Sequence, residues 1–145
     1  MTEPASTTWI RKAAAFALAI YWMALVAGTH VPRPPQLLIP RGLSDKWIHL
    51  LAYTGLAFLL CVNWSLRRHW NWRHCAALVA LLALFGAVDE LTQIPVGREC
   101  EFLDWIADVL GTSAGLLLFL AAWLVQRRMS WRSGRAAQKF GVGGR

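Results

Sequence analysis

The chain is short of acidic residues and of cysteine. Of its 145 residues, only 8 are Asp or Glu and only 3 are Cys. Cys61, Cys75 and Cys100 lie far apart, so their spacing indicates neither a disulfide framework nor the paired ligands of a structural zinc site. The sequence also has no His-Glu-x-x-His motif and no convincing internal repeat. The sequence therefore has no sharp metal-binding signature of that type and no repeat that suggests an inverted-repeat transporter.

Long hydrophobic runs are abundant instead. Hydrophobic residues make up 57% of the chain and nine residues are Trp, a composition too apolar for an ordinary soluble domain. A membrane-spanning helix needs about 20 predominantly apolar residues. Four runs meet this requirement, at about residues 13–31, 46–65, 75–94 and 103–125. We therefore predict an all-α, polytopic membrane protein with a single four-helix domain over residues 1–125 and a basic tail over residues 126–145.

The first hydrophobic run has a second interpretation. Arg11 and Lys12 precede it, and small residues near Ala27 and Gly28 end it. A cleaved signal peptide shows the same pattern. The three later runs favour a retained membrane helix.

The basic residues predict the orientation of the helices. Eleven of the 15 lie on one side in the predicted topology: Arg11, Lys12, Arg67, Arg68, Arg73, Arg127, Arg128, Arg132, Arg135, Lys139 and Arg145. Cytoplasmic loops are rich in Lys and Arg. We therefore predict an antiparallel bundle in the cell membrane, with both termini and the loop 66–74 in the cytoplasm and the loops 32–45 and 95–102 outside. The net charge of +7 then reflects topology rather than nucleic-acid binding, and we expect the tail to be poorly ordered beyond its first turns.

Tryptophan positions agree with these helix limits. Trp prefers the headgroup zone, and eight of the nine lie near predicted helix ends. The predicted inner boundary carries Trp9, Trp64, Trp70, Trp72, Trp123 and Trp131, and the outer boundary carries Trp47 and Trp105. Packing between helices is the alternative explanation for each of them.

The few acidic residues are concentrated at the predicted outer ends of the helices. Seven of the eight fall in three short segments beside apolar runs: Asp45, Asp89, Glu90, Glu99, Glu101, Asp104 and Asp108. Charge near bilayer depth is costly unless it is paired, hydrated or used in function. The placement of these acids therefore predicts a polar site near the outer membrane surface.

Helical periodicity groups these acids with other polar residues. Residues four apart share one side of a helix. The resulting sets are Asp45, His49 and Tyr53 on the second predicted helix, Asp89, Glu90 and Gln93 on the third beyond Gly86, and Asp104, Asp108 and Thr112 on the fourth. Gly111 and Gly115 would let another helix approach closely. At about 1.5 Å of rise per residue, the deeper groups lie about 5–8 Å below the outer hydrocarbon boundary, which predicts a shallow pocket open to the outside.

Several chemistries suit such a pocket. Glu90, Asp108 and His49 are the candidate catalytic residues, because a protonated carboxyl beside an ionised one can act as general acid and base. The same carboxylates with Asp89 could instead hold a cation, to which His49 adds a nitrogen ligand. Nearby Arg98, Lys46 or Arg41 could also balance the acids. The identity of any metal or cofactor stays open, and a hydrogen-bonded structural role is the alternative for His49.

The order of these motifs is distinctive over about residues 45–115. It runs Asp45-Lys46-x-x-His49-x-x-x-Tyr53, Asp89-Glu90-x-x-Gln93, Gly97-Arg98 and Asp104-x-x-x-Asp108-x-x-Gly111-x-x-x-Gly115. This order resembles the VanZ-like family of small bacterial membrane proteins. The resemblance implies a plasma-membrane protein whose named relatives are associated with low-level resistance to teicoplanin, but it implies no particular reaction. By position it adds substrate-binding candidates: Asp45, Lys46, Tyr53, Asp89, Gln93, Arg98 and Asp104.

Three functions remain open from the sequence. The leading hypothesis is a protein that binds or processes the polar headgroup of a lipid-linked envelope precursor or a similar amphiphile, with Arg98 gripping an anionic group. The second is a structural or assembly protein whose polar residues fix helix packing and partner contacts. The third is a small proton-coupled transporter, which four spans would form only as an oligomer. The ligand, the oligomeric state and the presence of catalysis are left open.

Overall fold

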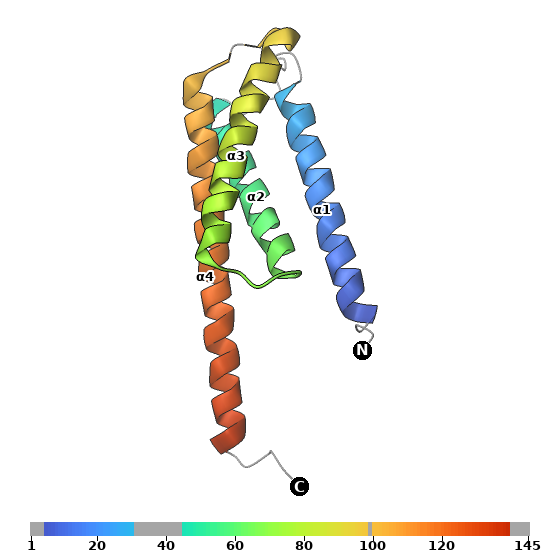
Figure 1. The fold of residues 1–145 in the computed structure, drawn as a ribbon, viewed down its shortest axis with the longest axis vertical. Helices are drawn as coiled ribbons and strands as arrows, with labels where there is room; N and C mark the ends of the chain where they lie inside the picture. Colours follow the sequence, from blue (N-terminus) through green and yellow to red (C-terminus); the bar gives the residue numbers. More distant parts are fainter. Residues whose placement is uncertain (1–4, 31–44, 99, 140–145) are drawn as a thin grey trace.

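Four long helices make up nearly all of the described chain. The structure is a computed structural model that describes residues 5–30, 45–98 and 100–139. The helices are α1 (Ala5–Thr29), α2 (Asp45–Ser65), α3 (Trp72–Gln93) and α4 (Phe102–Lys139), with a short 3-10 helix, η1 (Ile94–Val96), after α3 (Figure 1). The described residues contain no β-strand, so the predicted all-α class is confirmed.

Each predicted span corresponds to one of these helices. All four are long and apolar enough to cross a membrane, which supports the prediction of a membrane protein. α4 extends far beyond the predicted span and ends at Lys139. The segment after Val125 is therefore helical through Lys139, where we expected poor order beyond the first turns. Most of the predicted loop 32–45 lies outside the described residues, as do Arg41 and Glu99.

The exterior of the helices is largely apolar. On α1, for example, Trp9, Phe16 and Met23 are 71%, 68% and 72% exposed. A helix that presents large hydrophobic side chains outward suits lipid tails better than water. The surface therefore agrees with the hydropathy of the helices.

Two kinds of tryptophan lie near the predicted boundaries. Trp47 and Trp131 are exposed, as expected of side chains in the headgroup zone. Trp105 instead donates a hydrogen bond from Nε1 to the carbonyl oxygen of Ala83, 2.8 Å away. Packing between α4 and α3 therefore explains the position of Trp105.

Local sequence signals set both ends of α3. The side chain of Asn71 accepts a hydrogen bond from the backbone N–H of His74, and His74 Nδ1 accepts one from the N–H of Asn71. This reciprocal cap satisfies donors that a helix start leaves free. At the other end, Pro95 lies in η1 and Gly97 has a φ of 79°. Left-handed backbone favours glycine, so Gly97 allows the chain to turn directly after η1.

α2 and α4 form the most extensive helix contact. A Cβ atom at Gly111 would meet the carbonyl oxygen of Leu50, and one at Gly115 would meet that of Thr54. Small residues at this spacing let helix backbones approach closely in membranes. The predicted role of the glycine pair is therefore confirmed.

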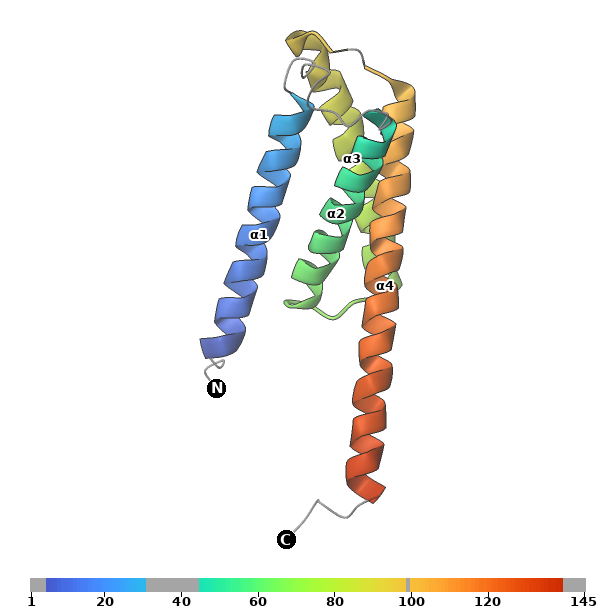
Figure 2. The ribbon, with the colours of Figure 1, turned by 180° about the vertical axis from the view of Figure 1, so that it is seen from behind.

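α1 lies against α2 and α3, on the side of α2 that faces away from α4 (Figure 2). The hydroxyl of Tyr21 donates a hydrogen bond to the carbonyl oxygen of Ala52 over 2.9 Å. The Tyr21 ring occupies the space beside Gly55, where a side chain would clash with it. A core of Leu25, Tyr53, Leu56, Ala57 and Leu82 fills the space between these three helices.

One end of the domain is joined by polar contacts. The hydroxyl of Thr29 donates to Asp89 Oδ1 over 3.1 Å, which joins the end of α1 to the end of α3. Lys46 Nζ lies 3.3 Å from Asp104 Oδ1, which joins the start of α2 to the start of α4. We call this end of the four helices the polar end.

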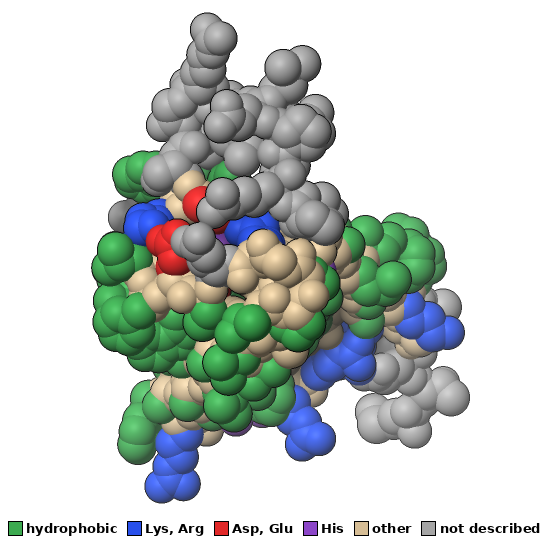
Figure 3. Space-filling view, turned by 90° about the horizontal axis from the view of Figure 1, so that it is seen from above, with side chains coloured by type: hydrophobic (Ala, Val, Ile, Leu, Met, Phe, Trp, Pro, Cys, Tyr) green, Lys and Arg blue, Asp and Glu red, His purple; other side chains and the backbone are tan. Residues whose placement is uncertain are grey.

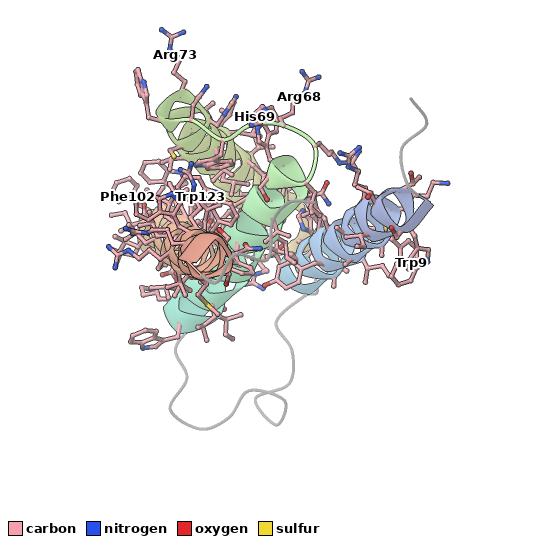
Figure 4. The ribbon with its side chains drawn as sticks, turned by 90° about the horizontal axis from the view of Figure 1, so that it is seen from below. Trp9, Arg68, His69, Arg73, Phe102 and Trp123 are labelled. Atoms are coloured by element: carbon pink, nitrogen blue, oxygen red, sulfur yellow. The ribbon has the colours of Figure 1, made fainter. Side chains whose placement is uncertain are left out.

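The opposite end carries exposed basic residues, and we call it the basic end. Arg11 Nε donates to the carbonyl oxygen of Leu66 over 2.7 Å, which joins the start of α1 to the end of α2. Figure 4 views this end and shows Arg68, His69 and Arg73 pointing away from the helices. A cavity of about 190 Å³ near this end is lined mainly by apolar and aromatic side chains: Leu60, Trp64, Trp70, His74, Ala77, Leu78 and Leu81.

Candidate functional site

Two basic residues pair with the carboxylates at the rim of the polar end. Lys46 Nζ lies 2.8 Å from Glu101 Oε2 and 3.3 Å from Asp104 Oδ1. Arg98 donates from Nη2 to Asp45 Oδ2 over 2.8 Å. Figure 3, seen from this end, shows acidic and basic side chains next to one another, with hydrophobic side chains beside them. We call these five residues the rim.

His49, Glu90 and Asp108 meet between three helices. Nδ1 of His49 on α2 lies 2.9 Å from Asp108 Oδ1 on α4 and 3.8 Å from Glu90 Oε1 on α3. The exposed fractions of His49, Glu90 and Asp108 are 3%, 3% and 0%. The structure therefore brings together the three side chains predicted as catalytic candidates, which we call the interior triad. Their chemical role stays a prediction.

Amide donors fix the carboxylates of α3. Gln93, which is 1% exposed, donates from Nε2 to Asp89 Oδ2 over 3.2 Å and to Glu90 Oε1 over 3.4 Å. The backbone N–H of Glu101 donates to Glu90 Oε2 over 3.1 Å. Both carboxylates thus have partners from their own helix, and the segment before α4 orients Glu90.

Two further polar residues of the site, Thr29 at the end of α1 and His30 directly after it, were not identified from the sequence. Besides the Thr29 bond to Asp89, His30 Nδ1 lies 3.8 Å from Asp89 Oδ1, and His30 Nε2 lies 3.0 Å from Thr92 Oγ1. In the sequence, these two residues are visible as a Thr-His pair at the end of the first apolar run. No spacing rule connects the end of the first helix to the end of the third, so periodicity could not assign these contacts.

The interior carboxylates differ from the rim carboxylates in their ion-pair partners. Within the described ranges, no Lys or Arg forms an ion pair with Asp89, Glu90 or Asp108, whose basic partners are His30 and His49. Removing a carboxylate from water is unfavourable unless charge and hydrogen bonds compensate it. The interior of the site therefore depends on imidazole, amide and hydroxyl groups.

Three buried oxygens beside the triad have unused bonding capacity. Tyr53 and Thr112 are 0% exposed, as is Asp108. In the described part of the chain, Tyr53 OH, Thr112 Oγ1 and Asp108 Oδ2 make no hydrogen bond. Tyr53 OH and Asp108 Oδ2 both lie beside Gly86, where the Asp108 side chain occupies the space that a larger residue would need. Buried polar atoms are rarely left unpaired, which makes this the part of the site with capacity for another partner.

Two sets of side chains have the composition and spacing of metal ligands. They are His49, Glu90 and Asp108, and Asp45, His49 and Asp104, and the donor atoms of each set lie within 4.8 Å of one another. All three members of the first set are buried, whereas Asp45 in the second set is exposed. Because His49 belongs to both sets, the two sets would compete for one imidazole.

The predicted site residues all lie at the polar end. Four belong to the rim: Asp45, Lys46, Arg98 and Asp104. Seven are buried, and they include the rim residue Asp104: His49, Tyr53, Asp89, Glu90, Gln93, Asp104 and Asp108. Sequence periodicity had placed the buried residues in a pocket open to the outside, but in the structure they are packed against one another. An occupant would therefore reach the triad only if side chains at the polar end move apart.

A scan against protein-family models, a search of curated proteins and a search of solved structures find no match. The resemblance of the motifs to the VanZ-like family therefore stays part of a proposal.

Proposed function

We propose that the chain is a VanZ-like protein of the bacterial cell membrane. In this proposal it forms an antiparallel four-helix bundle with both termini in the cytoplasm and the polar end outside. The concentration of Lys and Arg at the basic end supports this orientation, because cytoplasmic segments are rich in these residues. The order of polar motifs over residues 45–115 supports the family assignment.

The proposed function of the polar end is to bind or process the polar headgroup of an amphiphile, such as a lipid-linked envelope precursor. The observation that carries this proposal is the convergence of His49, Glu90 and Asp108 from three helices at one end of apolar spans. Interhelical hydrogen bonds in membranes contribute only about 0.6 kcal/mol on average. Several buried carboxylates are therefore an inefficient means of holding helices together, and a ligand explains them better.

Each part of the site has a proposed task. Glu90 and Asp108 would accept hydrogen bonds from hydroxyl or ammonium groups of the ligand, or exchange protons with it through His49. Arg98 would exchange its partner Asp45 for an anionic group of the ligand, since guanidinium groups bind carboxylate and phosphate well. Resistance to teicoplanin is the cellular property proposed from the family resemblance.

Survival of teicoplanin is the test. Cells that produce the chain, its Glu90→Gln and Asp108→Asn variants, or no chain are compared for the lowest inhibitory concentration of the antibiotic. We expect the wild-type chain to raise this concentration at least two-fold and both variants to behave like cells without the chain. Glu101→Gln is the matched control, because it makes the same change at an exposed rim position, and it should retain the wild-type effect.

Protein level and thermal stability of each variant in detergent are measured in the same strains. If Glu90→Gln and Asp108→Asn are inserted, stable and fully protective, the proposed role of the triad is wrong. If the wild-type chain gives no protection, the link to teicoplanin is wrong.

A structural role is the second candidate function, and the cross-helix hydrogen bonds favour it. His49 bonds to Asp108 between α2 and α4, and Thr29 bonds to Asp89 between α1 and α3. A structural or assembly protein would lose thermal stability or change oligomer size in the Glu90→Gln and Asp108→Asn variants. The headgroup proposal instead requires a loss of protection by variants that stay folded.

A further inference from the structure

The charges of the interior triad are incompletely balanced by the described side chains. Glu90 and Asp108 are buried carboxylates, and His49 is the basic residue that both of them approach. One imidazole carries at most a single positive charge. At the rim, by contrast, Lys46 and Arg98 already pair with the carboxylates. A doubly charged cation would match the two carboxylates of the triad and leave His49 neutral, as a metal ligand must be.

The spacing of the donor atoms agrees with such an ion. Donors held about 2.1 Å from one metal lie about 3.0 Å apart at a right angle and about 3.4 Å apart at the tetrahedral angle. His49 Nδ1 lies 2.9 Å from Asp108 Oδ1 and 3.8 Å from Glu90 Oε1. All three donor atoms lie within 4.8 Å of one another, so small side-chain movements toward a common point would bring them to one ion.

A second observation comes from the unused oxygens beside the triad. Asp108 Oδ2 belongs to one of the three proposed ligands, is fully buried and makes no hydrogen bond among the described residues. Tyr53 OH is equally buried and, like Asp108 Oδ2, lies beside Gly86, so the hydroxyl and this carboxylate are neighbours. A carboxylate that binds a metal can use its second oxygen, and a neighbouring hydroxyl can bond to a ligand of the metal. The site therefore holds unused capacity where the ion would be.

We propose that His49, Glu90 and Asp108 bind one divalent transition-metal ion, and that this ion is zinc. One imidazole nitrogen with two carboxylate oxygens suits Zn²⁺ better than Mg²⁺, which prefers oxygen ligands alone. Three protein ligands leave a position for water or for a ligand oxygen. The proposal goes beyond headgroup binding and holds whether or not an amphiphile binds the polar end.

The rival set of Asp45, His49 and Asp104 is less suitable. Asp45 is exposed and pairs with Arg98, and Asp104 pairs with Lys46. A zinc ion there would have to displace two cations that already neutralise its ligands. The Asp45→Asn variant separates the two sets, because Asp45 belongs only to the rival one.

Zinc binding by the full chain in detergent micelles tests the proposal. The protein carries an affinity tag without histidine and a Cys100→Ser background change, because the exposed Cys100 thiol could bind zinc on its own. It is stripped with EDTA, incubated with Zn²⁺, desalted and analysed for metal by mass spectrometry. We expect one zinc per chain in the parent protein and in the Asp45→Asn and Glu101→Gln variants. His49→Gln, Glu90→Gln and Asp108→Asn should each weaken zinc binding at least ten-fold.

Thermal unfolding and cobalt spectra keep the result interpretable if a triad variant is poorly folded. Added Zn²⁺ should raise the unfolding temperature of the parent protein and of Asp45→Asn, and EDTA should reverse the rise. Bound Co²⁺ in the parent protein should give visible absorption bands of a site with nitrogen and oxygen ligands. A parent protein that binds no zinc overturns the proposal, as does a Glu90→Gln variant that binds zinc normally. Equal loss of zinc in Asp45→Asn and Glu90→Gln overturns the choice of ligands.

Discussion

The polar end and the basic end both carry charge, but they place it differently. At the polar end, carboxylates are buried between helices and contact imidazole, amide and ammonium groups. At the basic end, cations point outward or lie over aromatic rings, with the Arg127 guanidinium 4.6 Å from the Trp123 ring centre. The net charge of +7 comes mainly from the basic end. The burial of charged side chains therefore identifies the candidate site, whereas the net charge of the chain does not.

An apolar layer separates these two ends. Among the described residues, the buried side chains between the triad and the basic end include Leu56, Cys61, Leu82 and Phe119. A proton relay needs a chain of polar groups across the membrane. This layer therefore favours a site with access from one side over the proton-coupled transporter considered from the sequence.

The largest expected difference between the polar end and the basic end is in the chemical labelling of native cysteines. Cys100 is exposed near the polar end, Cys75 is half-buried near the basic end and Cys61 is buried. If the polar end faces outward, a membrane-impermeant maleimide should label Cys100 in intact cells and should reach Cys75 only after the membrane is opened. The label is located by mass spectrometry, with Cys100→Ser as the control. Labelling of Cys75 in intact cells would reverse the proposed orientation.

The next largest effect is expected on the unfolding free energy, when a substitution disturbs the close packing of α2 on α4. Gly111→Val would push a side chain into the backbone of Leu50, and overpacking of this kind costs about 1–3 kcal/mol. Gly28→Val makes the same change where no atom lies within 4 Å of the added Cβ, and it should cost no more than about 0.5 kcal/mol. Unfolding in SDS, followed by Trp fluorescence, measures both. Equal losses would show that helix propensity, and not the α2–α4 contact, determines the result.

A salt-dependent effect is expected at the rim. Lys46→Met removes the exposed ion pair to Glu101, and exposed pairs contribute about 0.2–1 kcal/mol. The substitution also removes the ammonium beside the buried Asp104 carboxylate, which adds to the loss. The loss should shrink in about 1 M salt, where the screening length falls to about 3 Å. Lys12→Met, an exposed position at the basic end, provides the control and should change the unfolding free energy less. A salt-independent loss in Lys46→Met would point to packing of its alkyl chain instead.

Hydropathy and helical spacing predicted much of this architecture for physical reasons. Runs of apolar residues are long enough to span a bilayer, and residues four apart must share a helix face, so the His49 and Asp108 stripes could be predicted before their helices were placed. Which residues meet across helices depends on rotation and register, and these are set by packing. The 2.9 Å contact of His49 with Asp108, and the approach of Thr29 to Asp89, could therefore not be deduced.

For the basic tail, the sequence led to a wrong expectation about order. Its basic charge and small residues led us to expect poor order, but Arg, Ala, Gln and Met are also good helix formers. The segment follows directly on a membrane helix, so it needs no new nucleus and can continue the existing turns. Local propensity was thus a better guide to residues 126–139 than composition.

The unbroken course of α4 has a consequence for the membrane in which the chain is studied. Its 38 residues extend about 57 Å, nearly twice the roughly 30 Å hydrocarbon thickness. Asp104 and Asp108 lie on the same unbroken helix as the arginines of the basic end, and no hinge separates them. A thinner bilayer that tilts α4 would therefore displace both aspartates relative to α2. Lipid chain length becomes an experimental variable for the geometry around His49, and short-chain detergents could alter it without any change in sequence.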